Sequence, residues 1–155
     1  MDKKIGNITI EGARLIHRNF SGNATQFNPQ GNRNFSVVLD PELANALMAD
    51  GWNVKMKPSR DDQEDPFYYL PVTVRFDPIA PNIYMVTSRG RTLLDESNVN
   101  LLDAAIIKNA DLKIHPRAWS TATGSGVKAY LRTLYATIEE DELDLKYADI
   151  PISGR

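Results

Sequence analysis

The chain has 155 residues, which is the size of one domain. Hydrophobic residues make up 42% and charged residues 25%, which excludes a disordered chain, a collagen-like repeat and a coiled-coil rod. No apolar run of about 18 residues occurs, so we expect no membrane-spanning helix. The charged, alternating N-terminal stretch is unlike a signal peptide. Without cysteine, the chain cannot form disulfides, a catalytic thiolate or a sulfur-ligated zinc site.

Charge is distributed unevenly along the chain. The formal net charge of −2 argues against a nucleic-acid partner, because domains that bind nucleic acid are usually basic. However, residues 139–155 hold six acids and two bases, and the run 61–65 holds four more acids. The rest of the chain keeps 16 Lys and Arg against 10 Asp and Glu. This division predicts a basic body with an acidic tail and an acidic loop, although such runs are also common as plain solvated ends and loops.

Alternating apolar and polar residues, together with β-branched runs, predict a chain of short strands. The expected strands cover 5–16, 35–40, 52–56, 68–76, 83–86, 110–119 and 127–139. Gly12 indicates a bulge or bend in the first of these, and Pro71 indicates an edge position or a bulge in the fourth. Short strands, Gly-rich turns and one or two helices favour a mainly β fold, a small Greek-key barrel.

The segments between these strands carry helix and loop signals. The stretch 17–34 is rich in Asn and Gly and predicts a long loop. Asp40 followed by Pro41 predicts a helix N-terminus, and Gly51 predicts the left-handed end of that helix. The mixed pattern over 93–107 predicts a short helix capped near Asp95, followed by an irregular turn. Further loops or turns are expected at 58–66, 88–91 and 121–126.

Recognisable catalytic signatures are missing from the sequence. None of the serines lies in a nucleophile elbow, and no phosphate-binding loop of the Walker type occurs. The two histidines, His17 and His115, have no fixed spacing to paired acids, and the carboxylates cluster in solvated runs. The sequence therefore predicts no enzyme activity, no metal site and no cofactor.

Basic and aromatic residues alternate along the predicted hairpin of 110–119 and 127–139. On one face the first strand places Lys113, His115, Arg117 and Trp119, and the second places Lys128, Tyr130 and Arg132. Tyr69 and Arg75 repeat this pattern on the strand 68–76. Single-stranded nucleic acid is bound by this combination, because cations neutralise phosphates and flat rings stack on bases. The solvent face of any sheet also carries such residues, so a plain solvated face is the alternative.

Five more cations are candidates for nucleic-acid contacts. Arg33 follows the Asn-rich loop, Lys55 and Lys57 share one face of their strand, and Arg89 and Arg91 lie on the basic turn. A tryptophan, Trp52, directly follows the predicted end of the helix. For this side chain, packing in the core is favoured over stacking on a base.

Three segments carry a family resemblance: 32–55, 68–76 and 110–139. The last is the most specific, with a strand ending in a Pro-x-x-Trp element, a Gly-containing turn and a strand with Lys-Ala-Tyr-Leu. Together the segments resemble the phage-encoded single-stranded DNA-binding proteins that have an oligonucleotide/oligosaccharide-binding (OB) fold. The resemblance implies an OB-fold-like domain over 1–139 that binds single-stranded DNA without sequence preference, during phage replication or recombination in the host cytoplasm. By this analogy the groove is lined by Tyr69, Arg75, Trp119, Lys128 and Tyr130.

The tail over 140–155 allows a second comparison. Bacterial single-strand binders end in an acidic tip with Asp-Ile-Pro-Phe that docks on partner proteins, and this chain has Asp149, Ile150 and Pro151 followed by Ile152. We therefore expect a tail that competes with DNA or docks replication or recombination proteins. The sequence leaves a homo-oligomer open. The alternative function is a non-catalytic protein-interaction or virion-accessory β-barrel, and a nuclease is less favoured.

Overall fold

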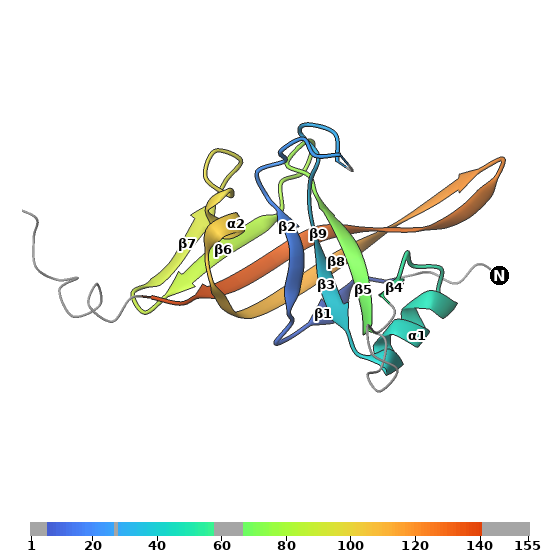
Figure 1. The fold of residues 1–155 in the computed structure, drawn as a ribbon, viewed down its shortest axis with the longest axis horizontal. Coiled ribbons are helices and arrows are strands. Elements are labelled where there is room, and N and C mark those ends of the chain that lie inside the picture. The colour runs from blue at the N-terminus through green and yellow to red at the C-terminus, as the bar shows by residue number, and fades with distance from the viewer. Residues whose placement is uncertain (1–5, 27, 58–66, 141–155) are drawn as a thin grey trace, which may run out of the picture.

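The computed structural model describes residues 6–26, 28–57 and 67–140, and this part is mainly β with two short helices (Figure 1). This composition is consistent with the predicted OB-like fold. The strands are β1 (Ile8–Ile10), β2 (Leu15–Asn19), β3 (Arg33–Leu39), β4 (Lys55–Lys57), β5 (Phe67–Val74), β6 (Asn82–Thr87), β7 (Gly90–Leu94), β8 (Ile107–Thr121) and β9 (Gly124–Ile138). The helices are α1 (Pro41–Ala49) and α2 (Leu101–Ala104). The acidic run 61–65 and the tail from residue 141 lie outside the described residues.

All nine strands join one open, mixed sheet in which β9 is the organising strand. The order is β1-β8-β9-β5-β3-β2, with β4 added to β5, β6 added to β9, and β7 added to β6. β9 runs antiparallel to β8 over almost its whole length. Its residues Ala129 and Tyr130 pair with β5 in parallel, and its second half pairs with β6 in parallel. The two halves of the sheet therefore meet along one long strand.

The predicted first strand, 5–16, consists of two strands separated by a bend. β1 pairs with β8 and β2 pairs with β3, so the two strands lie at opposite ends of the strand order. Gly12 has a φ of 62°, and its N–H donates to Asp111 Oδ1 at 2.9 Å. The bend indicated by this glycine is confirmed, because only a residue without a side chain adopts this φ readily. The loop 17–34 is shorter than expected at both ends, since β2 continues to Asn19 and β3 begins at Arg33.

Helix α1 begins and ends as predicted. The Asp40 carboxylate accepts a hydrogen bond from the Leu43 N–H at 2.7 Å, and Pro41 is the first helical residue. Gly51, with a φ of 90°, follows the C-cap. The helix thus turns the chain from β3 back toward the sheet.

The predicted strand over 52–56 is wrong in its first half. Only Lys55–Lys57 forms a strand, and Trp52 instead makes an isolated bridge with Val127 of β9. Trp52 is buried in the core, as the sequence favoured. The alternation of Trp52 and Val54 reflects packing against the core rather than a continuous ladder.

Pro71 is not on an edge strand, because β5 has neighbours on both sides. It pairs in register with Ser36 of β3. On the other side of β5, pairing with β4 stops at Tyr69 and pairing with β9 starts at Val72. Pro71 therefore lies at the point where β5 changes partner, which is where a missing N–H disturbs the ladders least.

The hairpin of β8 and β9 is longer than predicted and reaches beyond the rest of the sheet (Figure 1). Both strands have 15 residues, and the pairing continues to Thr121 and Gly124. The predicted loop 121–126 thus contracts to a two-residue turn. A register shift between Lys113 and Ile114 bends the ladder part-way along.

The region 88–107 differs from the sequence prediction in two ways. The basic turn is followed at once by β7, an unpredicted strand that pairs with β6. The short helix begins at Leu101 rather than near Asp95. The Asp95 carboxylate accepts the N–H and the hydroxyl of Ser97 instead, and these hydrogen bonds lower the pKa of that carboxyl.

A single hydrophobic cluster unites both halves of the sheet. It includes Phe20, Phe35 and Leu70 from one half and Ile83 and Leu134 from the other, all of them fully buried. The longer strands β5, β8 and β9 therefore have a core face and an opposite face, and the opposite face is free to carry function. Neither described helix is long and apolar enough to cross a membrane.

Candidate nucleic-acid interface

Most predicted contact residues lie together on the side of the sheet opposite the core, here called the outer face. Strand register establishes this, because directly paired residues point to the same side. His115 of β8 pairs with Tyr130 of β9, which pairs with Thr73 of β5. The outer face contains these predicted residues: Lys55, Lys57, Tyr69, Lys113, His115, Arg117, Trp119, Lys128, Tyr130 and Arg132.

Tyr130 is the best-supported stacking residue on this face. The Arg117 guanidinium lies 6.0 Å from its ring centroid and the Lys128 ammonium 5.4 Å. Arg117 and Lys128 are themselves cross-strand partners, so the hairpin holds both cations beside the ring. No carboxylate of the described residues lies within ion-pair distance of either cation. Both charges therefore stay available to phosphates.

His115 extends the same surface toward β1. Its Nδ1 lies 2.8 Å from Asn7 Oδ1, so the ring is held in place while it remains exposed. Lys113 pairs with Thr9 of β1 and Thr133 of β9, next to the register shift, and is exposed. The cations of β8 therefore form a row along the outer face.

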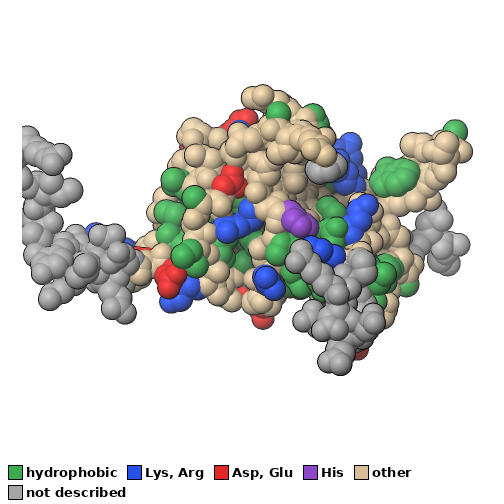
Figure 2. All heavy atoms as spheres, viewed as in Figure 1, with side chains coloured by type: hydrophobic (Ala, Val, Ile, Leu, Met, Phe, Trp, Pro, Cys, Tyr) green, Lys and Arg blue, Asp and Glu red, His purple; other side chains and the backbone are tan. Residues whose placement is uncertain are grey.

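A second cluster of rings and cations lies where β4 joins β5. Lys55 pairs with Tyr69, and Lys57 pairs with Phe67, so all four side chains share the outer face. The Lys57 ammonium lies 5.8 Å from the Phe67 ring centroid, and the rings of Phe67 and Tyr69 are 6.1 Å apart. His17 of β2 packs edge-on against Tyr69 at 5.3 Å. Figure 2 shows Lys and Arg side chains around a histidine near the middle of one face, with hydrophobic side chains between them.

Two hollows border Tyr130 and Lys128. One, of about 290 Å³, is lined by both Arg75 and Arg117 and by Tyr130. Arg75 is exposed and its Nε donates to the Asp77 carbonyl oxygen at 2.9 Å, which orients the guanidinium. The other hollow, of about 360 Å³, is lined by Trp119 and Lys128. The outer face is therefore a grooved surface.

Arg33 does not belong to the outer face. It shares a side of β3 with the buried Phe35, at one end of the core. Its Nη1 donates to the Phe20 carbonyl oxygen at 2.6 Å, its Nη2 lies 3.8 Å from Glu96, and its guanidinium covers the Phe76 ring. These contacts give Arg33 a structural role, tying the loop after β2 to the sheet.

Arg89 and Arg91 lie on the hairpin of β6 and β7, at the end of β9 opposite Trp119. Arg91 lies over the Tyr84 ring at 4.8 Å and donates to the Tyr135 hydroxyl at 3.4 Å. Tyr84 and Tyr135 stack on each other at 4.9 Å, with ring planes 13° apart. The two predicted arginines are therefore separated from the other candidates.

Comparison with known proteins now identifies the family. The family model described as "Putative phage ssDNA-binding domain" matches residues 1–155. The chain belongs to this family. Because the match spans the whole chain, it covers the outer face and both hollows.

Solved structures agree on the fold. The single-stranded DNA-binding protein from bacteriophage Enc34, solved in complex with ssDNA, has a TM-score of 0.57 at 10% identity, covering 90% of this chain and 95% of that one. Another structure of the Enc34 protein has a TM-score of 0.54 at 12% identity, covering 96% of each chain. At these identities the likeness shows a shared fold. No curated protein sequence matches the chain.

Several aromatic residues near the candidates are not among the predicted contact residues. Phe67 begins β5, one residue before the predicted strand, and its alternation with Tyr69 is the signal that could have revealed it. His17 belongs to this surface through its contact with the Tyr69 ring, a contact that the sequence does not predict. Tyr84 and Tyr135 meet because β6 and β9 are parallel neighbours, a pairing for which the sequence carries no signal.

Proposed function

We propose that the outer face binds single-stranded DNA without sequence preference, through phosphate contacts of its Lys and Arg residues and base stacking on its rings. The observation that carries this proposal is the arrangement around Tyr130: Arg117 and Lys128 lie beside its ring, one hollow is lined by the ring and a second is lined by Lys128. Membership of the phage single-strand-binding family supports it. So does the shared fold with a phage protein solved in complex with ssDNA.

The chemistry of the face explains the expected lack of sequence preference. Phosphates are the same in every nucleotide, and every base offers a flat π-face to an aromatic ring. Reading a base sequence would need polar groups that point at base edges. The candidate residues of the outer face are instead mostly aromatic rings and cations. The proposed interaction contains no chemical step on the DNA.

The experiment that tests the proposal is a binding titration with single-stranded DNA, duplex DNA and RNA of equal length at two salt concentrations. We expect the single strand to bind most tightly and its affinity to fall steeply with salt, because cations released from the phosphates drive the association. An affinity that does not change with salt would contradict the electrostatic part. Equal affinity for duplex and single strand would contradict the stacking part.

We further propose that this binding serves phage DNA replication or recombination in the host cytoplasm, and that the acidic tail over 140–155 takes part. The first residue of the tail, Glu140, accepts hydrogen bonds from the Ser88 N–H and hydroxyl at 3.0 and 3.2 Å. The tail therefore leaves the body beside the turn that carries Arg89. A pull-down of host replication proteins with the full chain and with a chain ending at residue 139 tests the docking role, which equal recovery from both would exclude.

A further inference from the structure

The 360 Å³ hollow lies at a fork in the sheet. β9 pairs with β5 only from Ala129 onward, and the hairpin before that point separates from β5. The hairpin is nevertheless held in place, because the Val127 N–H donates to the Gly51 carbonyl oxygen at 2.9 Å. The hollow is lined by the segment 51–53 on one side, by Pro71 and Thr73 of β5 on another, and by the hairpin on the third.

The hairpin wall of this hollow presents a flat ring. Trp119 is 46% exposed, which is unusual for the largest apolar side chain. The ring lies against Gly126, its cross-strand partner: a Cβ at that position would come within 3.0 to 3.1 Å of three atoms of the indole. The absence of a side chain at Gly126 therefore lets the indole pack directly against the backbone of β9. Pro71 adds a second apolar ring to the lining.

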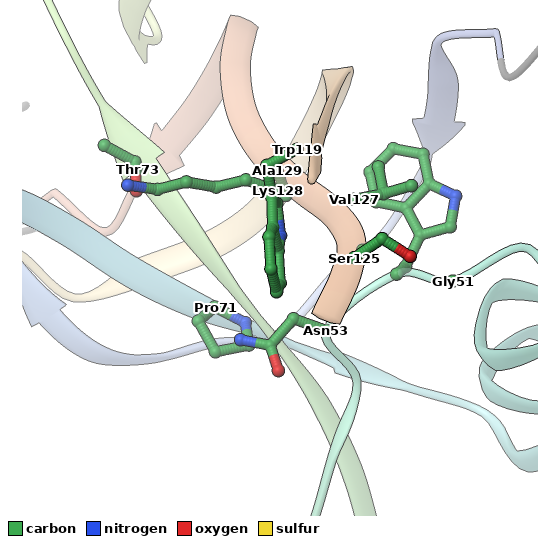
Figure 3. A pocket seen from close by; sticks show the side chains of 11 residues that line it. Gly51, Asn53, Pro71, Thr73, Trp119, Ser125, Val127, Lys128 and Ala129 are labelled. Atoms are coloured by element: carbon green, nitrogen blue, oxygen red, sulfur yellow. The ribbon is translucent and has the colours of Figure 1, made fainter. Parts of the chain in front are cut away.

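Polar side chains also line the hollow. Figure 3 shows the Lys128 side chain extended along one side toward Thr73, with Pro71 and Asn53 together at another. Trp52 lines the hollow from the core, and its buried Nε1–H has no acceptor among the described residues. A concave site with apolar rings, a few polar groups and one cation is the usual form of a site for a small flat molecule.

We propose that this hollow accepts one unstacked nucleobase of the bound strand, which lies against the Trp119 indole while Lys128 neutralises the neighbouring phosphate. The inference rests on the proposed function and deepens it. Lys128 lies 5.4 Å from the Tyr130 ring, so the hollow and the central stacking residue share a cation. A strand that runs from Tyr130 into the fork would therefore keep Lys128 beside its phosphates.

A glycine substitution with a matched control tests the proposal. Gly126→Ala places a methyl group against the indole and displaces the ring from its packing position against β9. Gly124→Ala, two residues away on the same strand, meets nothing within 4 Å, and neither glycine has a positive φ that would strain an alanine. Both variants are titrated with oligo-dT and with an equally long oligomer of abasic residues, and their thermal unfolding is compared with that of the unsubstituted protein.

We expect Gly126→Ala to weaken binding to oligo-dT roughly fivefold or more, the lower end of what losing one base–aromatic stack costs. Its binding to the abasic oligomer should not change, and Gly124→Ala should match the unsubstituted protein on both ligands. Unchanged oligo-dT binding by a folded Gly126→Ala variant would overturn the proposal, as would an equal loss on the abasic oligomer. If the unsubstituted protein itself failed to bind oligo-dT, the proposed function would be wrong instead.

Photocrosslinking provides a measurement that needs no variant. Oligo-dT carrying 5-iododeoxyuridine is bound to the full chain, irradiated and mapped by mass spectrometry. Crosslinks on Trp119 or on the segment 51–53 are the expected result. Crosslinks on Tyr130 with none on Trp119 or 51–53 would overturn the base pocket while leaving the proposed function intact.

Discussion

Two ends of β9 carry the same kinds of residue but use them differently. Toward one end, Tyr130 lies beside two cations that make no ion pair with the described carboxylates, with one hollow lined by its ring and a second lined by Lys128. At the other end, Tyr84, Tyr135 and Arg91 stack on one another. A ring that already stacks on a neighbouring side chain has less open surface for a base. An arginine beside an aromatic ring is therefore a better candidate for DNA binding where no second ring already stacks on that ring.

Tyr130→Ala is expected to have the largest effect on binding. Removing the ring should weaken binding to oligo-dT by about 1–3 kcal/mol, the typical value for one stacked base. Tyr84→Ala, at the other end of β9, should change the affinity much less and serves as the control. Fluorescence titration measures both variants, and circular dichroism verifies that they fold. An equal loss for both would contradict the distinction between the two ends.

Arg33→Ala is expected to reduce stability rather than affinity. The guanidinium donates to a backbone carbonyl at 2.6 Å and covers an aromatic ring. Hydrogen bonds of charged groups contribute about 1.5–3 kcal/mol, so we expect a loss of this size in the free energy of unfolding. Urea denaturation measures it. A stable variant with clearly weakened DNA binding would instead return Arg33 to the interface.

Replacing both Arg117 and Lys128 by alanine should lower the salt dependence of binding. Each cation that contacts a phosphate contributes about 0.7 to the slope of log K against log salt concentration for a single strand. The double variant should therefore lose about 1.4 from this slope, whereas Arg33→Ala should keep it. Titrations at four or more salt concentrations give the slopes. An unchanged slope in the double variant would show that phosphates bind elsewhere.

Removing residues 140–155 should produce the smallest change. The deleted segment holds five acids and two bases, so its loss makes the protein more basic. We expect a modest rise in affinity for single-stranded DNA at low salt that disappears at high salt, because exposed charges are screened. A tail of the same length with the five acids replaced by Asn or Gln is the control for length. A rise that persists at high salt would contradict a purely electrostatic role.

The sequence predicted the elements that depend on residues close together in the chain. The helix N-terminus at Asp40, the bend at Gly12 and the alternation on 110–119 and 127–139 all depend on neighbours within a few residues, and the structure contains each of them. Predictions failed where the partner was distant. Pro71 indicates an edge position or a bulge, because proline has no N–H to donate to a neighbouring strand. The sequence does not show that β5 changes its partner at this residue.

The sequence by itself determined the chemistry of this protein: a basic body, an acidic tail, and strands whose solvent faces carry rings beside cations. Alternation fixed those faces because side chains of a strand point to opposite sides at every step. Only the tertiary structure decided which faces meet. It joined Tyr130 to Thr73 through a parallel ladder, turned Arg33 toward the core and opened the fork at Trp119, because pairing between distant strands depends on the packing of the whole core.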